Sequence, residues 1–138
     1  MLSLLGAIVI HIAIVAALLQ SLPHRTISAT DEHGTTAQYS GVALRDILTQ
    51  QGVPTGHDIH GDVMTRCVVV DAADGYRVVF SLSELDPSFT DRVVLIADSR
   101  DGAALPAREG PYRLIVPGDK RDARWARQVT SVDVEDAP

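Results

Sequence analysis

The chain has a single cysteine, Cys67, and aromatic residues make up only 4% of its 138 residues. One cysteine excludes an internal disulfide framework and any metal site built from several thiolates. The sequence also contains no glycine-rich phosphate loop, dinucleotide-binding fingerprint or nucleophile elbow, so those enzyme classes are not indicated. With a net charge of −6 and a pI near 5.2, the chain would repel nucleic acid, and we expect no nucleic-acid partner.

Charge is also missing from residues 2–19, an apolar run interrupted only by Ser3, Gly6 and His11. As a helix, this run would reach about 27 Å, which is at the lower edge of a membrane span. It therefore predicts a signal peptide or membrane anchor over residues 1–22, and with it a periplasmic or other extracytoplasmic location. The β-branched residues of the run would equally suit a buried strand, which is the alternative interpretation.

Short strands and tight turns follow Pro23, whose ring blocks continuation of a helix. Alternating or valine-rich stretches predict strands at residues 25–30, 35–39, 64–72, 76–80, 93–97, 113–116 and 129–134. A helix is predicted at residues 41–48 and a helical turn at residues 83–86. This pattern indicates one α+β domain over residues 23–138, dominated by mixed sheet and with few short helices.

Four blocks of sequence follow one another in a characteristic order between residues 39 and 134. They are an aromatic-x-Gly-x-x-Leu stretch at 39–44, an Asp-Gly-Tyr turn at 74–76, an Asp-Gly-x-x-Leu-Pro turn at 101–106, and a Pro-x-Arg strand with a later Arg-Trp pair at 111–125. In this order they resemble the oxidoreductase molybdopterin-binding domain family, whose fold is that of sulfite oxidase. The resemblance implies a small, β-rich, single-domain member with a molybdopterin cofactor that carries molybdenum.

The same resemblance suggests which residues form the site. Tyr76 matches a tyrosine near the oxo-molybdenum centre, which implies a catalytic role as hydrogen-bond donor or proton relay. The pair at 124–125 matches a Lys-Trp pair beside the pterin and lies in a dense basic segment. The implied cofactor-binding residues are Lys120, Arg121, Arg124, Trp125 and Arg127. The alternatives are an ordinary half-buried tyrosine in a hairpin and a solvated basic turn.

The molybdenum ligand of the family has no counterpart in this chain. The family carries a ligating cysteine on the strand before the aromatic-x-Gly stretch, whereas residues 26–31 contain no sulfur. Ser28 or Asp31 could ligate only through oxygen, and Cys67 lies in an apolar run where a buried small side chain is expected. No residue is therefore assigned to the metal. Arg113 is expected on the solvent side of its strand, paired with a carboxylate.

These observations predict an exported, molybdopterin-binding oxidoreductase-like domain with lost or altered molybdenum ligation. If the domain is redox active, the resemblance implies oxygen-atom or electron transfer with a redox protein partner. The alternative is a cofactor-free extracytoplasmic interaction module that keeps only the scaffold. The missing thiolate favours the interaction module, while the surviving residues of the cofactor cleft favour the binding domain.

Overall fold

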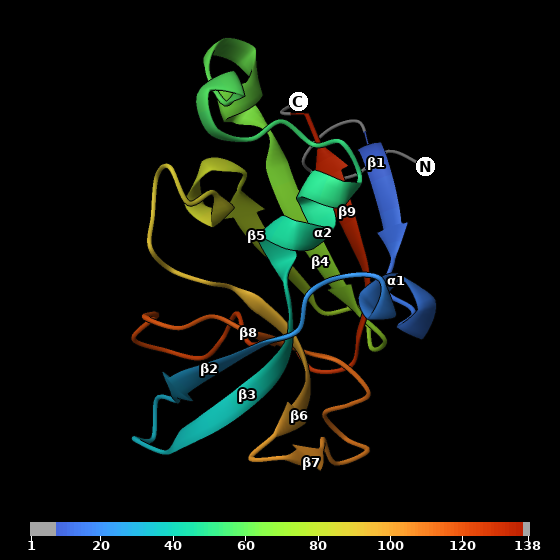
Figure 1. Ribbon diagram of the computed structural model, residues 1–138, viewed down its shortest axis with the longest axis vertical. Coiled ribbons are helices and arrows are strands. Elements are labelled where there is room, and N and C mark those ends of the chain that lie inside the picture. The colour runs from blue at the N-terminus through green and yellow to red at the C-terminus, as the bar shows by residue number, and fades with distance from the viewer. Residues whose placement is uncertain (1–7, 137–138) are drawn as a thin grey trace.

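The computed structural model describes residues 8–136, which form two antiparallel sheets and a few short helices (Figure 1). The first sheet has the strand order β1-β9-β4-β5. Its strands are β1 (Ile8–Ala13), β9 (Val129–Glu135), β4 (Cys67–Ala72) and β5 (Arg77–Ser81). The second sheet has the order β2-β3-β6-β7, and β8 also pairs with β6. Its strands are β2 (Arg25–Thr30), β3 (Thr36–Ala43), β6 (Leu95–Arg100), β7 (Ala103–Ala104) and β8 (Arg113–Ile115).

The helices are short and connect or cover the sheets. They are α1 (Ala16–Gln20), α2 (Leu44–Gln50) and the 3₁₀ turns η1 (Gly56–Asp58), η2 (Gly61–Thr65) and η3 (Ser83–Leu85). The predicted β-rich fold with few short helices is confirmed.

The β4–β5 hairpin turns at Asp74-Gly75, where the sequence places a two-residue turn signal. Gly75 has a φ of +88°, a conformation that glycine adopts without a steric cost. The amide of Ala72 donates to the carbonyl of Tyr76 across the turn at 2.9 Å. This turn fixes the register of the hairpin and places Tyr76 at its tip.

The helix predicted at residues 41–48 begins three residues later, because Gly41 and its two successors belong to β3. Gly41 pairs with Ala97 at an irregularity in the β3–β6 register. A Cβ atom at Gly41 would overlap the carbonyl oxygen of Ile96 and lie 2.7 Å from the Cα of Ala97. The glycine of the aromatic-x-Gly-x-x-Leu stretch is therefore needed for the close approach of these two strands.

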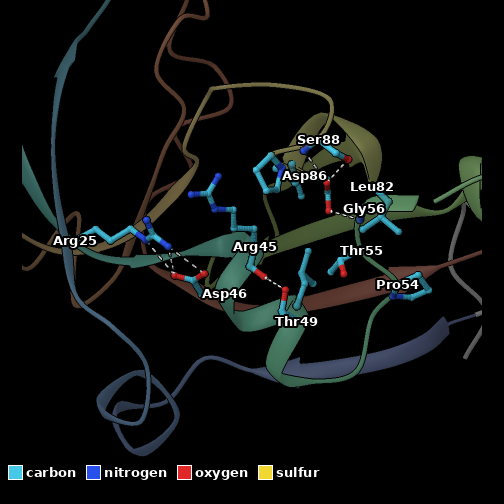
Figure 2. A pocket seen from close by; sticks show the side chains of 13 residues that line it. Arg25, Arg45, Asp46, Thr49, Pro54, Thr55, Gly56, Leu82, Asp86 and Ser88 are labelled. Carbon is cyan, nitrogen blue, oxygen red and sulfur yellow. Dashed lines mark hydrogen bonds and ion pairs between the residues drawn. The ribbon is translucent and has the colours of Figure 1, made fainter. Parts of the chain in front are cut away.

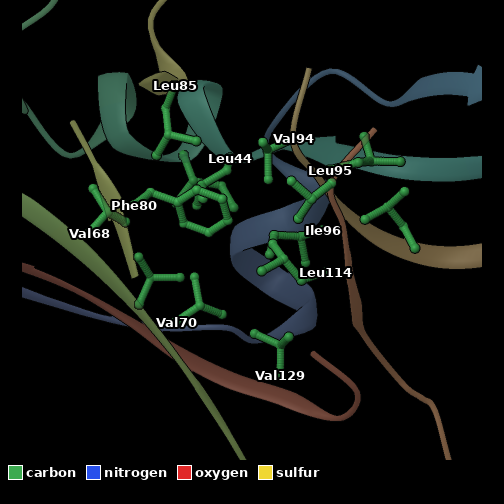
Figure 3. Close-up of a cluster of buried hydrophobic side chains, with 14 of the residues drawn as sticks. Leu44, Val68, Val70, Phe80, Leu85, Val94, Leu95, Ile96, Leu114 and Val129 are labelled. Atoms are coloured by element: carbon green, nitrogen blue, oxygen red, sulfur yellow. The ribbon is translucent and has the colours of Figure 1, made fainter. Parts of the chain in front are cut away.

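The core lies between the sheets and beneath α2 (Figure 3). Phe80 from the first sheet, Leu44 from α2 and Leu95, Ile96 and Leu114 from the second sheet are all fully buried. Burial of each such side chain stabilises the fold by about 1.5–3 kcal/mol. The chain is thus long enough to hold both sheets and α2 around one continuous core.

The N-terminal apolar run contributes a strand within the described residues. β1 pairs with β9 from Ile8 to Ala13, and Ile12 and Ile14 are buried. Residues 8–13 of the apolar run thus form a strand, which was the alternative interpretation of the run. Along residues 8–136, none of the helices has the length and apolar character needed to cross a membrane. A signal peptide or anchor over residues 1–22 stays a prediction, and residues 1–7 of it lie outside the described residues.

Candidate functional site

Tyr76 stands at the tip of the β4–β5 hairpin and links it to the segment that precedes Trp125. Its hydroxyl donates to the backbone carbonyl of Ala123 at 2.5 Å. Its own amide donates to the Asp74 side chain at 3.0 Å, which holds the turn in place. The residue remains about half exposed, with 48% of its surface accessible. Tyr76 therefore forms one wall of a surface pocket while its proton is held by a carbonyl.

Trp125 forms the inner wall of this pocket and belongs largely to the core. It is buried, and its indole Nε1 donates to the carbonyl of Val116 at 3.0 Å. The guanidinium carbon of Arg113 lies 5.6 Å from its ring centroid. The hydrogen bond holds the indole nitrogen and core packing holds the ring, so Trp125 has little freedom to move. It therefore presents a rigid surface to the pocket.

The pocket, here called the Tyr76 pocket, has a volume of about 300 Å³. It is lined by Asp74, Tyr76, Arg108, Trp125, Ala126, Arg127 and Gln128. Three of the predicted site residues, Tyr76, Trp125 and Arg127, thus come together. Arg108 and Arg127 are exposed, and neither side chain makes a hydrogen bond or ion pair to another described residue. Two such guanidinium groups beside one carboxylate give the pocket a net positive charge.

Arg108 and Gln128 are pocket residues that the sequence analysis missed. Gln128 has a φ of +52°, and its side-chain amide donates to the carbonyl of Ala107 at 2.9 Å. Its backbone amide donates to the carbonyl of Glu109 at 2.8 Å. These bonds bring the segment around Arg108 beside the segment around Arg127. No sequence pattern marks a non-glycine residue for positive φ. The proximity of the Arg108 and Arg127 segments could therefore not be predicted from the sequence.

Arg124 does not line the Tyr76 pocket, although it precedes Trp125. Its guanidinium forms two bonds to the Asp119 carboxylate, at 2.9 and 3.1 Å, and one to Glu84 at 3.0 Å. The hydrogen bonds that Arg124 donates to Asp119 are the main cause that raises the pKa of Arg124; burial opposes this effect and Glu84 adds to it. The side chain also lies over Phe80, 4.4 Å from the ring centroid. Two carboxylates thus neutralise the arginine that the resemblance places beside the pterin.

Lys120 and Arg121 are exposed and lie outside the residues that line the Tyr76 pocket. Asp122, next to them, has a lowered pKa, chiefly because of a hydrogen bond with the side chain of Glu32, which outweighs the opposing effect of burial. An ionised Asp122 reduces the positive charge of this turn. The predicted basic cluster is therefore divided. Arg127 faces the Tyr76 pocket, Arg124 is paired with carboxylates, and Lys120 and Arg121 face solvent.

Arg113 differs from its predicted solvent-facing position, because it is buried at 8% exposure. The expected carboxylate partner is present: Arg113 donates to Glu109 at 2.6 Å, and Arg100 donates to the same oxygen at 3.3 Å. Glu109 is itself 2% exposed. A buried guanidinium requires such a partner, since an unpaired charge away from water is strongly unfavourable. The pair lies behind Trp125 and supports the pocket from inside.

The strand that would carry the molybdenum ligand offers oxygen atoms only. Ser28 lies on the exposed face of β2, and the carboxylate of Asp31 accepts bonds from the amides of His33 and Thr35. Cys67 lies in the other sheet, opposite Ser81 at the end of the hairpin remote from Tyr76. The residues present therefore fit an anionic group in the Tyr76 pocket, but they do not fit a thiolate-ligated metal.

The chain matches the model of a known protein family. The family model described as "Oxidoreductase molybdopterin binding domain" matches residues 16–138. The match covers both sheets except β1, and it includes every residue of the Tyr76 pocket. Among curated proteins, none matches the chain.

Proposed function

Because the chain belongs to the oxidoreductase molybdopterin binding domain family, we propose that it binds a molybdopterin-type cofactor through the Tyr76 pocket, with molybdenum ligation lost or altered. The convergence of Tyr76, Trp125 and Arg127 with Arg108, whose side chain has no partner within residues 8–136, carries this proposal. A phosphate is the natural ligand for two exposed guanidinium groups, since each planar fork donates two parallel hydrogen bonds.

Each pocket residue has a separate task in this proposal. Arg108 and Arg127 neutralise and orient the phosphate of the cofactor, while Trp125 gives a rigid apolar surface beside it. Tyr76, the candidate catalytic residue, holds the Ala123 carbonyl and keeps its oxygen lone pairs free to accept a hydrogen bond. When bound with its metal, such a cofactor supplies oxygen-atom or electron transfer. A Tyr76→Phe variant that keeps full turnover would contradict the catalytic role.

The altered ligation rests on the donor atoms available. High-valent molybdenum held by a dithiolene is suited to a thiolate ligand, and the strand 26–31 provides none. We therefore do not assign a metal-dependent step to any residue of the chain.

The test is to express the full chain in a host that makes the cofactor. Molybdenum is measured by mass spectrometry, and pterin by the fluorescence of its oxidised product. We expect near-stoichiometric pterin, and the Arg108→Gln/Arg127→Gln double variant should lose most of it. Arg45→Gln, on a different part of the surface, is the matched control and should retain pterin. Absence of pterin from the unaltered protein would overturn the proposal.

A cofactor-free interaction module is the second candidate, and a specific observation favours it. Arg113 and Arg124, the most enclosed arginines near the site, are already neutralised by carboxylates. A scaffold in which internal pairs replace contacts to an anionic ligand can fold without that ligand. Under this candidate the exported protein contains neither metal nor pterin, and partner proteins are the next object of search.

We also propose that the domain works outside the cytoplasm, together with a redox protein partner if it is redox active. The apolar run at residues 2–19 supports export. Since β1 is paired with β9 in the folded domain, we propose that residues 8–13 are neither cleaved nor held in the membrane after export. A reporter enzyme that is active only outside the cytoplasm, fused after Pro138, tests the location, and mass spectrometry of the exported protein tests retention. A reporter without activity overturns the proposed location.

A further inference from the structure

A second and larger pocket, here called the Arg45 pocket, opens between α2 and the segments that flank η1 and η3 (Figure 2). Its volume is about 460 Å³. It is lined by Arg25, Arg45, Asp46, Leu48, Thr49, Pro54, Thr55, Gly56, Leu82, Leu85, Asp86, Pro87 and Ser88. It shares no lining residue with the Tyr76 pocket. Its volume falls within the range of about 300–1,000 Å³ that is common for small-molecule sites.

Arg45 is a cation of this pocket that has no partner among the described residues. Its guanidinium makes no hydrogen bond or ion pair with any residue in the part of the chain that the structure describes. Arg25, by contrast, is paired through two nitrogens with Asp46, at 3.0 and 3.3 Å. Figure 2 shows Arg45 rising from α2 between this pair and Asp86. Arg45 therefore presents its full set of donors to whatever enters the pocket.

Asp86 lines the same pocket but is bound within its own loop and forms no ion pair with Arg45. It accepts bonds from the Gly56 amide at 3.0 Å and from the amide and hydroxyl of Ser88 at 2.9 and 2.6 Å. Burial alone would raise the pKa of Asp86, but these bonds and the nearby charge of Arg45 outweigh it, so the pKa is lowered. Asp86 thus stays ionised, and its charge and that of Arg45 attract each other although the two groups form no ion pair.

The remaining lining combines apolar side chains with a few hydroxyl groups. Leu48, Leu82 and Leu85 are each 3% exposed and belong to the core cluster, and the rings of Pro54 and Pro87 also line the pocket. The hydroxyls of Thr49 and Thr55 are at exposed positions along the lining. A single unpaired guanidinium beside an apolar surface suits a ligand with one anionic end and one apolar end.

We propose that the Arg45 pocket binds a small organic monocarboxylate, with its carboxylate on the Arg45 guanidinium and its apolar body against the rings of Pro54 and Pro87. A carboxylate matches the planar fork of arginine in two parallel hydrogen bonds. A dianionic phosphate fits less well, because Asp46 and Asp86 add two negative charges to the lining. The Arg45 pocket is separate from the Tyr76 pocket, so binding of the carboxylate does not require the cofactor.

The probe is 3-phenylpropanoate, titrated into the isotope-labelled full chain and followed by amide NMR shifts. We expect saturable shifts at Thr55, Gly56 and Leu85. The neutral analogue 3-phenylpropanamide, which lacks the charge-assisted bonds, should bind at least about tenfold more weakly. Arg45→Gln should weaken binding of the carboxylate by a similar factor while leaving the affinity for the amide almost unchanged.

Two further variants test whether the carboxylate occupies the Arg45 pocket itself. Thr49→Trp places a large ring at an exposed lining position and should block binding without removing a charge. Arg127→Gln, in the Tyr76 pocket, is the matched control and should retain the affinity of the unaltered chain. Shifts that do not saturate, shifts centred on Tyr76, or an Arg45→Gln variant that binds the carboxylate normally would each overturn the proposal.

Discussion

Tyr39 and Trp125 meet edge to face, with ring centroids 5.8 Å apart and ring planes at 89°. The contact joins two sequence blocks that lie more than eighty positions apart, the aromatic-x-Gly stretch of β3 and the Arg-Trp pair before β9. Both rings are buried at 4% exposure. The inner wall of the Tyr76 pocket is therefore fixed by an aromatic residue from the second sheet.

We predict that this aromatic contact contributes measurably to stability. Trp125→Phe removes the indole bond to Val116 and part of the ring, and should lower the free energy of unfolding by about 1–3 kcal/mol. Tyr39→Leu should lower it by about 1–2 kcal/mol, mainly through lost packing. In a double-mutant cycle measured by urea denaturation and circular dichroism, the coupling should be about 0.5–1.5 kcal/mol. Strict additivity of the two changes would contradict the contact.

The Glu109–Arg113 pair gives a second prediction. Glu109→Gln leaves the buried Arg113 without its carboxylate and should cost about 3–5 kcal/mol. Replacing both residues, as Glu109→Gln with Arg113→Met, should recover at least half of that loss, because no uncompensated charge remains. Urea denaturation measures both values. If the double variant is less stable than Glu109→Gln alone, the pair is not a self-contained buried unit.

Asp86 predicts a specific dependence of stability on pH. Its pKa is lowered in the folded chain, so the group contributes stability at pH values above its unfolded pKa of about 3.9. That contribution is lost as the pH falls through the lower folded pKa. Asp86→Asn should therefore show a smaller loss of stability between about pH 5 and pH 2, measured by urea denaturation. Asp58→Asn, at an exposed position, is the matched control and should leave the profile unchanged.

The position of β1 predicts a contrast between two residues of the apolar run. Ile12→Asn puts an amide at a buried position opposite Val132 and should destabilise the domain by about 3 kcal/mol or more. Val9→Asn alters a residue that is 42% exposed and should cost less than about 1 kcal/mol. Thermal unfolding of the purified full chain measures both. Equal and small effects would mean that the run does not contribute to the folded domain.

The amino-acid sequence was sufficient to predict the elements whose cause is local. The Asp74-Gly75 turn follows from the conformational freedom of glycine, and the valine-rich stretch ending at Ala72 follows from strand preference and burial. The order of the four blocks also identified the family, because Gly41 and Trp125 serve the packing of this particular fold. These features depend on neighbouring residues or on a preserved pattern, and both can be read from the chain.

Which charges remain available, by contrast, depends on the folded arrangement. Arg124 and Trp125 are adjacent in sequence, yet one pairs with Asp119 and Glu84 while the other enters the core. Asp119 is only five positions from Arg124 along the chain, whereas Glu84 is brought near it by the fold. The local pattern does not show which arginine such carboxylates neutralise and which one stays free. The same holds for β1, since an apolar run suits a membrane or a strand equally until a partner such as β9 provides its hydrogen bonds.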